Sequence, residues 1–587
     1  MSKKSARKRA ALFSSLSTLA LLVGLSGSAA AASETPGDTF GASQTFAGAY
    51  AEAGIGQQVT ISDSGRYVAF LSESQDLDPE APALAQAYVK DLQTGALLLA
   101  SRAEGPVGAP SNEPREEGHW GVERPYISGN GHYLAFETPA DNLVSDFPSA
   151  TEFPRHVYRR DLTTGETTLV DRVTGASGEI IPVEARLESI SDDGRYIVFS
   201  DRAEGLEDPG GEHEEGPETI YVRDLQEGVT TAVDRASGLA GELAGEGAEE
   251  GAISDDDRYV LFTSASTNLD SEANGIYQVY RRDLQTGQTL LISRTPPTVS
   301  APEGEPADGE SFEAKFVGTS DCRVAFLGVG TTNLDPSEED PALGVYLRDF
   351  CSSPPTTTLV SVRQDGEPFE EAVSPVATDD GRIGFEGQNL FPETRHFYLR
   401  DIAAGQTTLV DRAGGAEGEP AGREVEWNAV SANGCRAAFT STAGNLVGEG
   451  VVPAEKRQAY VRQLAPCVSA AGPSGVGGSS KDGSNLGSAP PTQLKIVRLS
   501  RRRLVLGFSG AGVAAVKIGR LVIDPRPHWK LVKKLLVRAG EAARKRIELP
   551  QLPPGRYRIG VRLRGSQGRP LLRHLMIGSP GGPGASG

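Results

Sequence analysis

Adjacent aspartates recur along the chain, and they are the residues whose type and spacing could perform acid–base chemistry. Asp192–Asp193 and Asp379–Asp380 are two examples. A pair of carboxyl groups with different pKa values is the usual machinery of glycoside hydrolysis. These pairs, however, occupy the same place in nearly every copy of a repeated phrase, where Asp and Gly supply the bonds and the backbone freedom of a tight turn. We therefore interpret them as turn residues and not as a catalytic pair.

The other chemically capable residues form no recognised motif. The seven histidines show no HExxH or i,i+4 pattern, and no GxSxG, Walker or dinucleotide-binding glycine phrase stands in a suitable context. The stretch Asn333–Asp340, "NLDPSEED", offers oxygens to Ca²⁺ but lacks a recognised loop geometry, so we favour a solvated acidic loop. We name no catalytic, cofactor-binding or metal-binding residue, expect no cofactor, and predict that the protein is not an enzyme.

One phrase occurs seven times in the sequence. The repeats are numbered 1 to 7 in the order in which these copies occur. Each copy is a tight turn followed by a strand, and after a loop comes an "RDLxTG"-like phrase between two further strands. In the clearest unit, Ile190–Arg235, this gives four antiparallel strands. The sequence therefore predicts an all-β fold, a seven-bladed β-propeller of four-stranded blades. The copies begin at Ile61, Ile127, Ile190, Ile253, Gly318, Ala377 and Val430.

The two phrases, in this order, resemble the TolB-type, WD-repeat-like propeller repeat of exported bacterial proteins. The resemblance covers roughly residues 40–467 and implies the fold. It does not extend to the C-terminal part, so we do not transfer the partners of TolB to this chain. In pairs such as Arg223–Asp224 we expect a turn bond and an ion pair within the blade.

The last repeat ends near Ala459–Cys467 without a fourth strand. The segment Asp38–Phe46 stands upstream of the first repeat, where a fourth strand would belong. We predict that it completes the last blade and closes the ring, which removes open strand edges. The longer loops all lie on one face and are acidic, as in Glu204–Glu218, so we expect a ligand on that face.

The four cysteines take matching places in two repeats. Cys322 opens the second strand of repeat 5 and Cys351 follows its third strand, and Cys435 and Cys467 do the same in repeat 7. The start of one strand lies beside the end of its antiparallel neighbour, within reach of a disulfide. We predict the bonds Cys322–Cys351 and Cys435–Cys467.

The sequence also predicts where the protein is located and how the chain divides into domains. Residues 1–32 combine a basic head, a short apolar stretch and small residues, which is typical of a secretory signal peptide. We expect the propeller at 33–467, a Gly/Ser/Pro linker at 468–491, a basic β-rich domain at 492–578 and a disordered tail at 579–587. The mature protein should be extracellular, associated with the cell wall or periplasmic, without a transmembrane segment.

The C-terminal part is strongly basic. Residues 492–578 hold six Lys and fifteen Arg against three acids, a net charge of +18, so the rest of the chain carries −38 of the total of −20. Its short alternating stretches predict a small sandwich. The phrase Leu552–Leu563 resembles the penultimate strand of immunoglobulin or fibronectin-like modules, which gives Tyr557 the role of a corner tyrosine. His528–Gly540 could instead form an amphipathic helix.

These features predict an exported, non-enzymatic binding or scaffold protein of the cell envelope or extracellular space. Its acidic loop face would bind a protein or an envelope polymer, and its basic module would tether it to a polyanion. Nucleic acid is not expected as a partner. Two alternatives stay open: a carbohydrate-active propeller enzyme, a glycan hydrolase or lyase with residues converging on the axis, and a structural surface-layer protein.

Overall fold

The computed structural model describes residues 35–467 except 46, 57, 113–120, 148–153, 210–212, 336–341, 389–393 and 449–450, and beyond them the backbone of the strands between 494 and 577. The chain divides into two compact units, Met1–Gly472 and Pro473–Gly587. The predicted signal peptide (1–32), linker (468–491) and tail (579–587) lie outside the described residues. No helix among the described residues is long and apolar enough to cross a membrane.

Repeats 1 to 4 each fold into a four-stranded antiparallel sheet whose strands pair in chain order. The strands are β2 (Val59–Ile61), β3 (Tyr67–Ser72), β4 (Gln86–Asp91) and β5 (Leu97–Leu99); β6 (Glu123–Ile127), β7 (Tyr133–Thr138), β8 (His156–Asp161) and β9 (Thr167–Leu169); β10 (Ala185–Ile190), β11 (Tyr196–Ala203), β12 (Glu215–Asp224) and β13 (Val229–Ala232); β14 (Glu249–Ile253), β15 (Tyr259–Ser264), β16 (Gln278–Asp283) and β17 (Thr289–Leu291).

Repeats 5 and 6 have the same order and are joined by one parallel bridge, and repeat 7 has three strands of its own. The strands are β18 (Glu310–Phe316), β19 (Arg323–Val329), β20 (Leu343–Asp349) and β21 (Thr356–Leu359); β22 (Glu371–Ala377), β23 (Arg382–Gln388), β24 (His396–Asp401) and β25 (Gln406–Leu409); β26 (Val425–Val430), β27 (Arg436–Ser441) and β28 (Gln458–Gln463).

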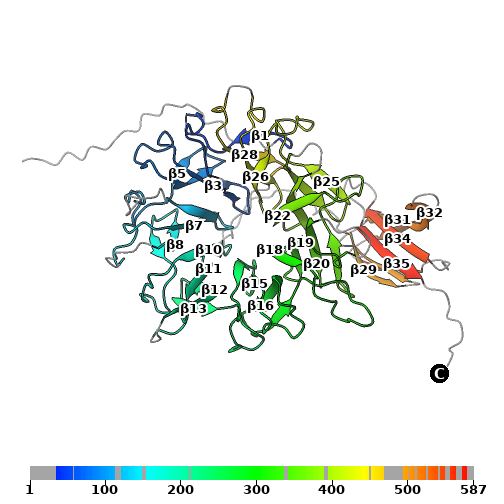
Figure 1. The fold of residues 1–587 in the computed structure, drawn as a ribbon. Helices are drawn as coiled ribbons and strands as arrows, with labels where there is room; N and C mark the ends of the chain where they lie inside the picture. The colour runs from blue at the N-terminus through cyan, green and yellow to red at the C-terminus, as the bar shows by residue number, and fades with distance from the viewer. Residues whose placement is uncertain are drawn as a thin grey trace, which may run out of the picture. The chain divides into compact units, whose positions relative to one another are not determined.

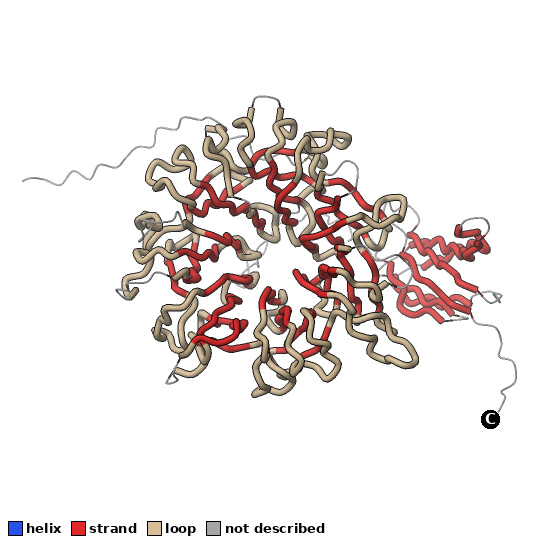
Figure 2. The backbone as a smooth tube through the Cα atoms, in the orientation of Figure 1, coloured by secondary structure: helices blue, strands red, loops and turns tan. Residues whose placement is uncertain are grey.

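The sheets of the first unit stand around a common axis (Figures 1 and 2). The first strand of a repeat, such as β10, lies nearest the axis and the fourth, such as β13, lies at the outer edge (Figure 1). The turns between the first and second strands of the repeats therefore all lie at the same end of the axis. This arrangement of four-stranded antiparallel sheets is that of propeller blades.

An aromatic pair forms the core of every repeat. A Phe of the second strand stacks on the Tyr directly opposite in the third strand, with ring centroids 5.6 to 6.0 Å apart. Phe199 and Tyr221 in repeat 3 are completely buried, and both come from the strand phrases that define the repeat. Such directly opposed pairs stabilise a sheet, and they explain why the phrase recurs.

The N-terminal segment supplies the fourth strand of repeat 7, as predicted. Strand β1 (Thr39–Gly41) pairs antiparallel with β28, and Ala42 N–H continues the ladder to Ala459 O at 2.8 Å. Gly41 is required at this place, because a Cβ there would lie 2.2 Å from the hydroxyl of Tyr50.

The second unit consists of two antiparallel sheets, ordered β29-β30-β33 and β32-β31-β34-β35. The amphipathic helix considered for His528–Gly540 is wrong: this segment is the strand β32, which pairs along its whole length with the Val- and Ile-rich β31. Pairing with a β-branched neighbour overrides the helical pattern. The strands are β29 (Leu494–Ser500), β30 (Arg503–Phe508), β31 (Gly512–Ile523), β32 (Pro527–Ala539), β33 (Ala543–Glu548), β34 (Gly555–Leu563) and β35 (Leu571–Ile577).

Candidate functional site

The two aspartates of each repeated pair have different surroundings. In repeat 3, Asp193 accepts hydrogen bonds from the hydroxyl of Ser191 at 2.9 Å and from the backbone N–H of Arg195 at 2.8 Å. These bonds close the turn, which is the role predicted for the pair. Asp192, one residue earlier, makes no such bond. The sequence interpretation therefore holds for the second aspartate only.

The first aspartates of several turns converge at the axis. The turns of neighbouring repeats are linked by backbone bonds, for example from Asp63 N–H to Gly129 O at 3.0 Å. A Cβ on Gly129 would lie 2.1 Å from Asp63 Oδ2 and 2.7 Å from Asp192 Oδ1, so two carboxylates from repeats 1 and 3 face each other across this glycine. We call the set Asp63, Asp192, Asp255 and Asp379 the acidic mouth.

Burial raises the pKa of all four carboxylates of the acidic mouth, and nearby carboxylates raise it further. Burial, and then the charges of Asp255 and Asp379, raise the pKa of Asp63 to about 6. Burial, and then the other acids of the mouth, raise the pKa of Asp192 to about 7. Burial and neighbouring carboxylates also raise the pKa of Asp255 and of Asp379. Desolvation and like charges both disfavour the ionised form.

No cationic side chain among the described residues pairs with the acidic mouth. Within the described part of the chain, none of its four carboxylates takes part in a hydrogen bond or an ion pair. The aspartate that ends the third strand is different, since Asp224 receives two hydrogen bonds from Arg195 at 2.9 and 2.5 Å. Unpaired carboxylates that lose water are costly, so the mouth is suited to receive positive charge.

Some described acids of the loop face, by contrast, pair with arginine. Arg294 binds Asp270 and Glu272, and Arg102 binds Asp78 and Glu80 in the same way. This pairing leaves less free charge on the loop face than the sequence led us to expect. In the acidic loop Asn333–Asp340, the Asp335 carboxylate accepts the backbone N–H of Leu359, and residues 336–340 lie outside the described part of the chain. The described residues contain no acid, His or Cys group arranged to hold a metal.

Glutamates further along the axis connect the innermost strands. Glu137 accepts the N–H of Leu187 at 2.8 Å from the next repeat. Glu250 likewise accepts the N–H of Glu313, whose own carboxylate accepts the N–H of Ser374. The sequence did not reveal these residues, because they vary from repeat to repeat and belong to no phrase. They connect neighbouring repeats through hydrogen bonds from backbone N–H groups to glutamate carboxylates.

The two residues of the "RD" phrase have different roles: the Asp stabilises a turn, and the Arg connects its repeat to the preceding one. Asp224 accepts the N–H groups of Gln226 and Glu227, which is the predicted turn bond, and its ion pair is with Arg195 of the same sheet. The guanidinium of Arg223 does not pair with an acid. It donates to the hydroxyl of Thr230 and to three backbone carbonyls of repeat 2, those of Arg172, Val173 and Gly175.

Buried histidine–aspartate pairs occur in two repeats. His156 Nδ1 lies 2.5 Å from Asp171 Oδ2, and His396 Nδ1 lies 2.6 Å from Asp411 Oδ2. Other repeats place Gln and Ser there, such as Gln278 bonded to Ser293. The repetition marks this as a structural position and gives the histidines no role in a site.

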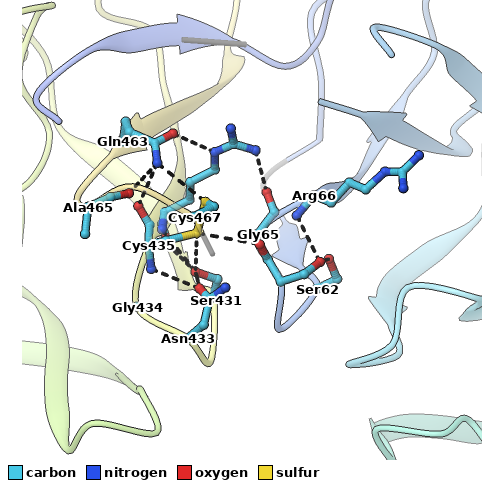
Figure 3. Close-up of a disulfide and its surroundings, with 12 residues drawn as sticks. Ser62, Gly65, Arg66, Ser431, Asn433, Gly434, Cys435, Gln463, Ala465 and Cys467 are labelled. Carbon is cyan, nitrogen blue, oxygen red and sulfur yellow. Dashed lines mark hydrogen bonds between the residues drawn. A yellow bond between two sulfur atoms is a disulfide. The ribbon is translucent and has the colours of Figure 1, made fainter. Parts of the chain in front are cut away.

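Both predicted cysteine pairs lie at disulfide distance. The Cα atoms of Cys322 and Cys351 are 5.4 Å apart, and those of Cys435 and Cys467 are 5.1 Å apart. Figure 3 shows the second disulfide beside the turn of repeat 1.

No family model and no curated protein matches this chain. Among solved structures it is similar to the tricorn protease (TM-score 0.39, 11% identity, 73% of this chain and 36% of that chain). It is also similar to the β-propeller domain of the Trilobed protease from Pyrococcus furiosus (0.30, 11%, 59% and 98%) and to the RRP9 WD40 repeats (0.36, 9%, 73% and 98%). The chain thus spans about a third of the tricorn protease. These likenesses concern the fold alone, and the propeller arrangement of this chain rests on its own four-stranded sheets.

Proposed function

We propose that this chain is an exported, non-enzymatic, seven-bladed propeller that binds a positively charged segment of a protein partner at its acidic mouth. The observation that carries the proposal is the convergence of Asp63, Asp192, Asp255 and Asp379, which have no ion-pair partner in the part of the chain that the structure describes. This moves the expected binding surface from the loop face to the opposite end of the axis, where the turns lie.

A basic segment suits the acidic mouth for an electrostatic reason. Each carboxylate there is disfavoured in its ionised form by burial and by its neighbours. A lysine or arginine side chain between them would turn this repulsion into attraction and stabilise the charged form. The acidic body would also steer a basic partner toward the ring and speed its association.

The finer features of the proposal come from the sequence. The segment 1–32 and the two cysteine pairs support export into an oxidising compartment. The net charge of +18 on residues 492–578 supports tethering of that module, which we propose to be a sandwich, to an anionic envelope polymer. Kinship with TolB-type repeats belongs to the same proposal.

The proposed binding at the acidic mouth can be tested with a fluorescent octalysine peptide. Its binding to the mature chain is measured by fluorescence anisotropy at low salt. We expect D63N/D192N to weaken binding at least tenfold and high salt to abolish it. The charge-matched control is E417Q/E419Q, which removes two exposed carboxylates from the loop after β25 and should leave binding unchanged. Equal affinity of D63N/D192N and the wild type would refute the proposed site.

A glycan-active enzyme is the second candidate, because Asp63 and Asp192 are two facing carboxyl groups with raised pKa values. Incubation with a panel of labelled glycans separates the two functions. The binding proposal predicts no cleavage product, whereas a product that disappears in D63N/D192N would establish the enzyme.

A further inference from the structure

Repeat 7 is held together differently from the others. In repeat 3 the third strand continues through a turn into the fourth, and Asp224 fastens that turn. In repeat 7 the third strand, β28, ends at Gln463 and its neighbour β1 comes from the other end of the chain. No turn therefore joins β28 to β1. The strand pairing itself covers Thr39–Gly41, and backbone hydrogen bonds from Ala42 to Ala459 and between Gly37–Asp38 and Gln463 extend it at both ends.

The segment after β28 folds back onto the start of β27. Leu464 N–H and Ala465 N–H both donate to the carbonyl of Cys435, at 2.7 and 3.1 Å. Arg436 Nε donates to Gln463 Oε1 at 2.7 Å, so the residue that replaces the usual aspartate also anchors this end (Figure 3). The bond from Cys467 to Cys435 completes the attachment.

The same disulfide lies at the seam where repeat 7 meets repeat 1. A Cβ on Gly65 would lie 2.9 Å from Cys435 Sγ. Arg436 Nη1 donates to Gly65 O at 2.9 Å, and Asn433 N–H donates to Asp63 O at 3.1 Å. The seam is thus closed at two places, by β1 on the outer side and by the Cys435 turn near the axis.

We propose that Cys435–Cys467 is a redox-sensitive clasp that fixes the exit of the chain from the ring and protects its closure. Cys467 is the last described residue before the second unit, and the proposal takes a pull on that unit to enter the ring there. With the bond intact, the pull passes to β27, which pairs with strands on both sides. Without it, the pull acts on β28 and peels it from the short strand β1.

Opening the clasp needs two electrons and two protons. A dithiol reductant supplies them: it becomes a cyclic disulfide, while Cys435 and Cys467 each gain a hydrogen as thiols. Reduction then leaves closure to the ladder between β1 and β28 and to the backbone bonds of the seam.

The disulfide of repeat 5 is a matched control. Cys322 and Cys351 occupy the equivalent places, but there the chain runs on into β21, which pairs with β20 in the same sheet. Loss of this bond leaves repeat 5 covalently continuous. The two bonds are alike in loop length and differ in whether the neighbouring strand is attached.

Hydrogen–deuterium exchange of the mature chain tests the clasp. We expect C435S/C467S to speed exchange of the β1 amides and Ala42 at least tenfold relative to the wild type, with C322S/C351S unchanged there. If C435S/C467S does not fold, the folded wild type is treated with dithiothreitol and should show the same local acceleration. Equal exchange of β1 in both double variants, or in oxidised and reduced wild type, would overturn the proposal.

Discussion

The ring of Tyr133 lies against Gly194, the glycine of the next repeat's turn. A Cβ at Gly194 would lie 2.3 Å from Tyr133 Cδ2, and Gly131 meets Tyr67 at the same distance. Both glycines have positive φ, 74° and 73°. Glycine is therefore favoured at this place in the repeated phrase for two reasons. It adopts the left-handed backbone conformation, and it leaves room for the tyrosine of the previous repeat.

Repeat 4 breaks this pattern and should gain stability when it is restored. Asp257 stands in the glycine's place with φ 59°, and its Oδ1 is buried without a hydrogen-bond partner. We expect D257G to stabilise the fold by about 1 kcal/mol, because it removes backbone strain and an unsatisfied group. Urea unfolding measures the change. The reverse variant, G194D, should destabilise by a larger amount, and a stabilising G194D would contradict this explanation.

In repeat 3 a buried aspartate lacks the histidine partner that the equivalent aspartates of repeats 2 and 6 have. Thr219 stands where His156 and His396 stand, and Asp234 Oδ2 is buried without a hydrogen bond. Burial raises the pKa of Asp234 to about 8. Replacing Thr219 with His should satisfy this oxygen and raise stability by about 1 kcal/mol at neutral pH. H156T should produce the opposite effect in repeat 2, and melting temperatures of the two variants that move in the same direction would refute the equivalence.

The acidic mouth should make the fold more stable at mildly acidic pH. Because the folded pKa values of Asp63 and Asp192, about 6 and about 7, lie above the ordinary value, folding takes up protons between those values and about pH 4. The stability from this protonation is fully present below the unfolded pKa and is lost as pH rises through about 7. D63N/D192N should be more stable than the wild type at pH 8 by about 1 to 2 kcal/mol, with no difference near pH 4. A pH-independent difference in urea unfolding would contradict this origin.

Closure of the ring by β1 should dominate its thermal stability. Deletion of residues 33–50 removes β1 and exposes the edge of β28, so the melting temperature should fall sharply. G41V tests the same contact with one change, since its side chain would collide with Tyr50. The control G444V places a side chain at an exposed glycine with no atom nearer than 3.9 Å and should be neutral. An unchanged melting temperature of the deletion would disprove the closure.

The features that could be predicted from the sequence are those that recur from repeat to repeat. The turns, the cysteine pairs and the place of β1 all follow from comparing one copy of the phrase with another. The acidic mouth could not be found this way, because Asp192 and Asp193 look alike in a single repeat and differ only once the turns are set around an axis. The roles of Glu137, Glu250 and Glu313 could not be predicted, because each bond crosses to the next repeat, 50 to 63 positions away in the chain.

The most direct test of the account measures protons released when the acidic mouth receives positive charge. Octalysine is titrated into the mature chain by calorimetry at about pH 6.5, in two buffers of different ionisation enthalpy. A cation that pairs with Asp63 and Asp192 lowers their pKa, so we predict release of about one proton per complex, abolished in D63N/D192N. Absence of binding, binding without proton release, or equal release in D63N/D192N would contradict the acidic mouth as the binding site.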